Sequence, residues 1–243
     1  MIGLQFQPDW PFGGGTVIEA MAVDGVYRSQ FVTGISNGGL TAFPGGDRWL
    51  WESRLFSGRY DEQSGTARPV YGVWNRYADV YGGAIRFGSS YLRLRPETVE
   101  RATFCFPDSA RDPADFGDQH ALPYLCQLAD AAALDPLDDY IEAHIHGPVR
   151  FATDVEALVL DPSFAGTAVE AAARELGCPI EYHPGFRATP ADFDPAYRGA
   201  ETVALARKLG DELTPHVLGA AARRHPAQQI KYVWHCLARF GRQ

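Results

Sequence analysis

The sequence predicts an α+β protein with two small packed sheets in front and a helical region in the last third of the chain. Short segments rich in aromatic and β-branched residues, separated by glycine-containing turns, crowd the first half of the sequence. Apolar residues recur at helical spacing in the last third. Strands and helices do not alternate regularly, so a doubly wound Rossmann sheet is not expected.

Strand signals run through the front and centre of the chain, as aromatic-rich or alternating segments. The expected strands are 70–74, 85–94, 102–106, 140–147 and 155–160. The last of these should end before Asp161-Pro162, because a proline restricts the residue that precedes it and cannot donate to a strand ladder.

Helical periodicity predicts one helix in the centre of the chain and four in its last third. The expected helices are 122–133, 167–176, 201–209, 217–224 and 228–239. Gly177 is the expected stop of the second helix, since glycine adopts the left-handed conformation that commonly ends a helix. Trp234 and Leu237 lie three residues apart on the last helix, so they should be buried against the sheets.

Length, charge and cysteine spacing limit what the protein can be. A chain of 243 residues without an evident linker or repeat is expected to form a single domain, 1–243. The net charge of -8 argues against a broad basic surface for nucleic-acid backbones or anionic membranes. Neither a leader sequence nor a long apolar run is evident, which indicates a cytoplasmic protein. The four widely spaced cysteines are expected to be reduced thiols.

The segment 140–147 carries the clearest functional signal. Because side chains of a strand alternate between its faces, one face of this segment carries Tyr140, Glu142, His144 and His146, and the other carries isoleucine and alanine. A carboxylate between apolar neighbours must be solvated, paired or functional. The segment therefore indicates either the solvated side of a sheet or a site of chemistry.

The same face is compatible with a metal site. The H-x-H pattern places two imidazoles on one side of a strand, and Glu142 can add a third ligand, as in a metal-dependent hydrolase. A cupin-type site would need a further glutamate where Arg150 and Phe151 stand. Histidines are often ordinary hydrogen-bonded groups, so no metal is expected.

Two glycine-rich segments invite comparison with ligand-binding loops. The run Gly-Gly-Gly-Thr at 13–16 lacks the spacing of a phosphate loop and follows no suitable strand, so a flexible turn is expected. The segment 34–46 is rich in turn-forming residues and can form an adaptable loop for a ligand or a partner.

Six short segments spread over nearly the whole chain carry a family resemblance. They are DGVYRSQF (24–31), TGISNGGL (33–40), RPVYG (68–72), RFGSS (86–90), DDYIEA (138–143) and VWH (233–235). These segments resemble a bacterial family known chiefly as a domain of unknown function. The resemblance implies no activity by itself.

A second resemblance rests on three residue types in a fixed order. Arg28 lies on an expected early strand, Ser89 or Ser90 lies in a serine-bearing strand, and Glu142 lies in a later strand. This order resembles the Arg-Ser-Glu order of ADP-ribosyltransferases, in which NAD binds in a cleft between two small sheets. The resemblance implies a mono-ADP-ribosyltransferase or an NAD glycohydrolase, with NAD as the co-substrate.

The resemblance also implies a role for each residue. Arg28 would hold a phosphate or ribose oxygen of NAD through charge-assisted hydrogen bonds. Ser89 or Ser90 would orient the glutamate. Glu142 would stabilise the positive charge that develops on the ribose as nicotinamide leaves.

The chain departs from the family pattern near the glutamate and in the serine run. Tyr140, implied to contact NAD, stands where family members usually carry Glu or Gln, so the ADP-ribose acceptor stays open among protein, nucleic acid, small molecule and water. Because the serine run is only Ser89-Ser90, Thr103 or Ser109 can supply the orienting hydroxyl instead. A non-catalytic ligand- or partner-binding module is a third class of function beside the transferase and the hydrolase.

Overall fold

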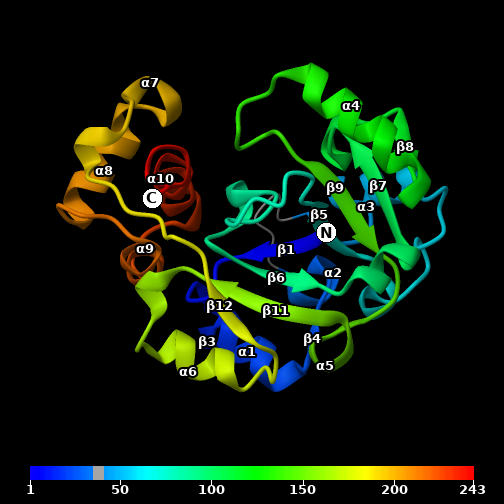
Figure 1. Ribbon diagram of the computed structural model, residues 1–243, viewed down its shortest axis with the longest axis horizontal. Helices are drawn as coiled ribbons and strands as arrows, with labels where there is room; N and C mark the ends of the chain where they lie inside the picture. Colours follow the sequence, from blue (N-terminus) through cyan, green and yellow to red (C-terminus); the bar gives the residue numbers. More distant parts are fainter. Residues whose placement is uncertain (35–40) are drawn as a thin grey trace.

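The predicted α+β class is confirmed by a computed structural model, which describes residues 1–34 and 41–243 (Figure 1). Its centre is an eight-stranded sheet with the order β12-β11-β6-β1-β5-β9-β7-β8. The strands of this sheet are β1 (Ile2–Phe6), β5 (Val70–Trp74), β6 (Ser90–Leu94), β7 (Ala102–Phe106), β8 (Asp115–Gly117), β9 (Ile141–Ile145), β11 (Val155–Leu160) and β12 (Ile180–Tyr182). Neighbouring strands are antiparallel except for the parallel pair β11–β12.

The sheet arrangement differs from the predicted pair of small packed sheets. Strands from the second half of the chain join those of the first half, because β9 pairs with both β5 and β7 and β11 pairs with β6. The remaining strands form two short ribbons instead of a second sheet. These ribbons are β2 (Pro11–Phe12) with β3 (Gly15–Thr16), and β4 (Val26–Tyr27) with β10 (Val149–Arg150).

The strand predicted at 85–94 is shorter than expected. A 3₁₀ turn, η2 (Ile85–Phe87), occupies its first residues, and β6 begins only at Ser90. Gly88 separates the two, and a Cβ at this position would lie 2.1 Å from the backbone of Phe6. Only glycine permits that approach, so the chain turns there before it enters the sheet.

The glycine run at 13–16 forms a turn, as predicted. Gly13 and Gly14 connect β2 to β3, both with positive φ angles that glycine adopts without strain. The ligand loop predicted at 34–46 falls partly on residues 35–40, which lie outside the described residues.

The end of the described chain is helical, as predicted, but six of the ten described helices lie before the last sheet strand. The helices are α1 (Val17–Asp24), α2 (Gln30–Thr33), α3 (Asp47–Leu55), α4 (Leu122–Ala132), α5 (Phe151–Asp154), α6 (Ala168–Arg174), α7 (Pro195–Arg198), α8 (Ala200–Leu209), α9 (Pro215–Ala222) and α10 (Ala227–Phe240). Short 3₁₀ turns are η1 (Gly65–Ala67), η3 (Pro96–Arg101), η4 (Ser109–Arg111), η5 (Gln119–Ala121), η6 (Pro162–Phe164) and η7 (Pro190–Asp192). The helices α7 to α10 gather at one side of the sheet (Figure 1).

Trp234 and Leu237 of α10 are buried, as predicted, but their partners differ from the prediction. Both belong to a second apolar cluster, separate from the core of the sheet, which includes Phe186 and Leu213. The indole N–H of Trp234 donates to the carbonyl of Ile85 at 3.0 Å. The C-terminal helices therefore have a core of their own, and α10 contacts the segment before β6 through η2.

Asp9, between β1 and β2, is a buried carboxyl that packs against α9. It is 6% exposed, and neither of its oxygens has a hydrogen-bond partner among the described residues. A Cβ on Gly219 would lie 1.8 Å from Asp9 Oδ2, so only glycine leaves room for the carboxyl. Burial raises the pKa of Asp9 from 3.8 to about 7, against the opposing charge of Arg223.

Replacing Asp9 with asparagine should stabilise the protein at neutral pH by about 1–3 kcal/mol, because the neutral amide avoids the desolvation of a charge. A carboxyl with a raised folded-state pKa destabilises the fold increasingly as pH rises from near 3.8 to about 7. The advantage of Asp9→Asn should therefore be small near pH 4 and constant above pH 7. Urea unfolding of both proteins across this range tests it. The neighbours of the carboxyl are His216, whose Nδ1 lies 3.8 Å from Asp9 Oδ2, and Arg223, so His216→Asn and Arg223→Met backgrounds separate their contributions. An advantage that does not change with pH would contradict the account.

Candidate functional site

Strand β9 sorts its side chains as the alternation predicts. Ile141, Ala143 and Ile145 belong to the core of the sheet. Glu142 and His144 point to the other face, and they are also buried, at 9% and 0% exposure. The solvated sheet face that the sequence also allowed is therefore not formed. A carboxylate buried in this way must be paired or functional.

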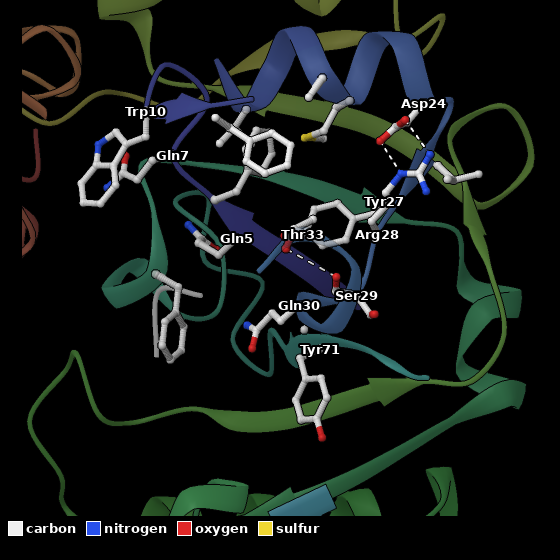
Figure 2. Close-up of a pocket in the computed structure, with 18 of the residues that line it drawn as sticks. Gln5, Gln7, Trp10, Asp24, Tyr27, Arg28, Ser29, Gln30, Thr33 and Tyr71 are labelled. Carbon is white, nitrogen blue, oxygen red and sulfur yellow. Dashed lines mark hydrogen bonds and ion pairs between the residues drawn. The ribbon is translucent and has the colours of Figure 1, made fainter. Parts of the chain in front are cut away.

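A pocket of about 360 Å³ lies between the main sheet and the two short ribbons. Residues of β1, β5 and β9 line it on the sheet side, and residues of β2, β4, α1 and α2 line it on the other. Figure 2 shows Trp10 at one side of the pocket and Arg28, held by Asp24, at the other. The volume is within the range of small-molecule sites.

Three of the predicted site residues line this pocket and two do not. Arg28, Tyr140 and Glu142 are lining residues although they are distant in sequence. Ser89 and Ser90 are fully buried and are not among the lining residues. The sheet order explains this separation, because β1 and β5 lie between β6 and β9, and neighbouring strands are about 4.8 Å apart.

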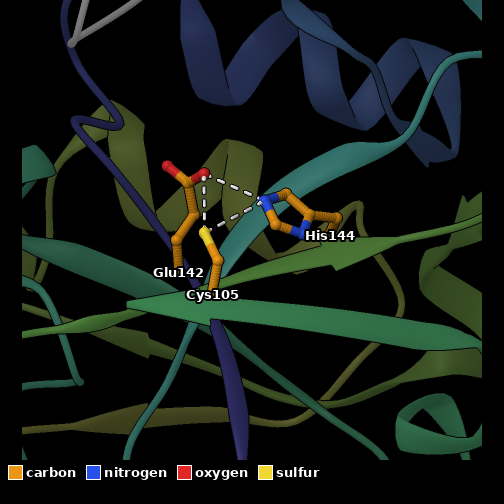
Figure 3. Close-up of side chains that lie close together, drawn as sticks. All are labelled: Cys105, Glu142 and His144. Atoms are coloured by element: carbon orange, nitrogen blue, oxygen red, sulfur yellow. Dashed lines mark hydrogen bonds and ion pairs between the residues drawn. The ribbon is translucent and has the colours of Figure 1, made fainter. Parts of the chain in front are cut away.

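Glu142 is oriented by groups other than the two serines. His144 Nε2 donates to Glu142 Oε1 at 2.9 Å (Figure 3). The backbone N–H of Ser109 donates to the same oxygen at 3.2 Å. Burial acts to raise the pKa of Glu142, but the His144 imidazole, the Ser109 N–H and the charge of Arg48 together lower it below its usual value. The carboxylate is therefore ionised where it meets the pocket.

A chain of hydrogen bonds extends from Glu142 across the strand. Thr103 lies opposite His144 in the β7–β9 register, and its hydroxyl contacts His144 Nδ1 at 3.2 Å and His146 Nε2 at 2.9 Å. The Tyr60 hydroxyl lies 2.7 Å from His146 Nδ1. Burial lowers the pKa of His146 to about 4, so its ring is neutral near pH 7. One assignment satisfies every contact: Tyr60 donates to His146, His146 to Thr103, Thr103 to His144, and His144 to Glu142.

Thr103→Val should lower the free energy of unfolding by about 1–3 kcal/mol, because the isosteric methyl leaves a nitrogen of His144 and one of His146 without a partner. Urea denaturation at pH 7 measures the change. Thr103→Ser is the matched control and should remain close to wild type, because it keeps the hydroxyl. A valine variant as stable as the serine variant would show that the chain of hydrogen bonds adds nothing to stability.

Cys105 completes a cluster of possible metal ligands with Glu142 and His144. Its Sγ lies 3.8 Å from Glu142 Oε1 and 3.9 Å from His144 Nε2 (Figure 3). Cys105 faces Glu142 directly in the β7–β9 register. His146, which the sequence placed in a metal set, is instead held at both ring nitrogens by Tyr60 and Thr103.

The same cluster is not arranged as a thiol catalytic triad. A triad needs one nitrogen of the histidine for the nucleophile and the other for the carboxylate. Here His144 Nε2 faces both Cys105 and Glu142. Burial and the charge of Glu142 also raise the pKa of the Cys105 thiol well above its usual range, which disfavours a thiolate. All four cysteines are free, as predicted.

A buried charge network beside the pocket was not predicted from the sequence. Arg48 and Glu52 are the buried residues of α3, one turn apart. Arg68 NH1 donates to Glu52 Oε1 at 2.6 Å, and the Tyr71 hydroxyl donates to Glu52 Oε2 at 3.1 Å. The only usable sequence signal is the i, i+4 spacing of Arg48 and Glu52, which resembles an ordinary exposed helix pair.

The chain belongs to a family described as "Protein of unknown function (DUF3626)". The family model matches residues 1–127 and residues 118–233. This confirms the first resemblance, to a family of unknown function. No curated protein matches the chain. Within the described residues, the helices lack the combination of length and apolar composition that crossing a membrane requires.

Proposed function

We propose that the pocket binds NAD and that Glu142 promotes cleavage of the bond between nicotinamide and ribose. The protein would then act as a mono-ADP-ribosyltransferase or an NAD glycohydrolase. The observation that carries the proposal is the buried, ionised carboxylate of Glu142 in the wall of a pocket that Arg28 also lines. Both residues belong to the Arg-Ser-Glu order noted in the sequence.

The chemistry needs a fixed negative charge at the reacting carbon. As the C1′–N bond breaks, nicotinamide leaves with the electron pair, and positive charge develops on C1′ and the ribose ring oxygen. Glu142 stabilises that charge, because a preorganised carboxylate in a site shielded from water acts strongly on it. A nucleophile then adds to C1′ and loses its proton. Water as the nucleophile gives ADP-ribose, and another acceptor gives an ADP-ribosylated product.

The walls of the pocket suit the flat rings of a dinucleotide. The aromatic residues among the lining are Phe6, Trp10, Phe12, Tyr27, Tyr71, Phe87 and Tyr140. Aromatic side chains bind such rings by stacking. The hydroxyl of Tyr140 donates to Asp108, so the ring face of Tyr140 is the part that would contact NAD. The pocket lies between the main sheet and the two short ribbons, so a dinucleotide bound there would be covered on both sides.

Purified protein incubated with NAD tests the proposal directly. Release of nicotinamide, measured by chromatography, is the expected result. NAD labelled in the adenylate moiety, added together with a cell lysate, then identifies the acceptor as water, protein, nucleic acid or a small molecule. If the protein binds NAD but releases no nicotinamide in either experiment, the result would support a binding module and reject the transferase.

A metal-dependent hydrolase is a second candidate, favoured by the cluster of Cys105, Glu142 and His144. Thiolate, imidazole and carboxylate are the ligands that zinc prefers, and the three ligand atoms lie within 4.8 Å of one another. Of the three residues, Glu142 alone lines the pocket. An ion at this site would therefore meet a substrate only on the Glu142 side.

Metal analysis of Cys105→Ala separates the two candidates. A hydrolase should contain about one zinc per chain and lose both metal and activity in this variant. The transferase should keep substantial nicotinamide release, because the cysteine has no part in the proposed chemistry. His144→Ala would remove the metal too, but it also removes a hydrogen bond to Glu142, so it is the less selective variant.

A further inference from the structure

The side chain of Arg48 is a buried cation with free hydrogen-bond donors. Arg48 is 6% exposed and lines the pocket. Its Nε and NH1 atoms have no hydrogen-bond partner among the described residues. A buried guanidinium without partners is costly, and native structures rarely keep one without a reason.

Other arginines near the pocket already have carboxylate partners. Arg28 makes two hydrogen bonds to Asp24. Arg68 is bound to Glu52 at 2.6 Å. The charge of Arg48 acts across space: it helps to lower the pKa of Glu142 and opposes the rise that burial causes in the pKa of Glu52. Among these cations, Arg48 is the one whose donors remain available to a ligand.

Aromatic rings hold the Arg48 guanidinium in place. Its central carbon lies 4.8 Å from the ring centre of Tyr71 and 5.6 Å from that of Trp51. The N–H groups of a guanidinium lie in its own plane and point outward from its edge. That edge geometry matches two oxygens of one phosphate. Arg48 also lies in the first turn of α3, where the helix dipole favours an anion.

We propose that the pocket takes a phosphate-bearing ligand and that Arg48 binds its phosphate. The inference deepens the proposed function, because it names the group of NAD that Arg48 would bind and moves that role away from the surface pair Arg28–Asp24. The pocket then has a cation at Arg48 and an anion at Glu142. NAD has the complementary pattern, with a negative pyrophosphate and a positive nicotinamide ring.

Calorimetric titration of the full chain with ADP-ribose, pyrophosphate and adenosine tests the proposal. Wild type should bind ADP-ribose and pyrophosphate. In Arg48→Met the affinity for both should fall roughly 10- to 100-fold, the loss expected when a charge-assisted hydrogen bond is removed. Any binding of adenosine, which lacks phosphate, should change little. Arg54→Met, on the same helix and outside this pocket, is the matched control and should bind like wild type.

The outcomes separate this inference from the proposed function. Suppose that Arg48→Met loses affinity for ADP-ribose but wild type does not release nicotinamide. That pair of results would support the phosphate site and reject the proposed enzymatic activity. Nicotinamide release by wild type, with equal ADP-ribose affinity in Arg48→Met, would keep the enzyme and overturn the phosphate site. If Arg48→Met does not fold, Arg48→Lys keeps the charge and should still lose affinity several-fold, because lysine cannot bind two oxygens in one plane. Wild-type affinity in Arg48→Lys would then overturn the bidentate contact.

Discussion

Glu142→Gln is expected to slow nicotinamide release by about 10²–10³-fold while leaving the fold and much of the NAD affinity intact. The amide keeps the shape of the side chain and an oxygen for the Ser109 N–H. It loses the negative charge that stabilises the transition state of nicotinamide release. The loss of one such preorganised contact has an effect of this size. The fall should appear mainly in kcat, because the charge on the ribose develops only during the reaction.

Glu156→Gln, on β11, is the matched control for this experiment. Glu156 pairs with Arg93 and lies outside the pocket, so its substitution should leave release unchanged. Circular dichroism and the melting temperature establish that both variants fold. Wild-type rates of nicotinamide release by Glu142→Gln would reject the proposed mechanism.

Arg68→Met is expected to lower the free energy of unfolding by about 3–5 kcal/mol, because it leaves the buried carboxylate of Glu52 without its charge partner. Glu52 is 0% exposed, and burial already raises its pKa above the usual value despite Arg68. Without Arg68 the carboxyl should protonate more readily. The deficit should therefore shrink as pH falls from 7 toward 5, since a raised folded-state pKa favours the fold at lower pH.

The double variant Arg68→Met/Glu52→Gln is the control for this prediction. Removing both charges avoids the unpaired carboxylate, so the double variant should regain most of the lost stability. Urea denaturation of wild type and both variants at pH 7 and pH 5 gives the six free energies required. A double variant less stable than Arg68→Met alone would show that packing, not charge, sets the effect of Arg68.

Local patterns predicted the part of the site that depends on one strand. Alternation alone placed Glu142 and His144 on the same face of β9 and the isoleucines in the core. The order of strands in the sheet has no such local signal. This is why the expected contact between Ser89 or Ser90 and Glu142 is absent, although Ser90 does begin a strand.

The groups that surround Glu142 depend on pairing between distant strands. Cys105 meets Glu142 because the β7–β9 register sets them opposite each other, and single-sequence patterns do not determine register between distant strands. Arg48 was missed for a different reason. A charged residue on a helix is normally exposed, whereas α3 buries Arg48 and Glu52 beside the pocket.

The insertion of β9 between β5 and β7 makes the two halves of the chain depend on each other during folding. Neither stretch that matches the family model, 1–127 or 118–233, contains both Arg48 and Glu142. A fragment that ends before β9 would expose the unpaired edges of β5 and β7, which are templates for aggregation. Pairing across such sequence distances also slows folding. Ligand binding would thus show that β9 has inserted between β5 and β7. Two halves of the chain that are produced separately should bind the ligand only after they associate.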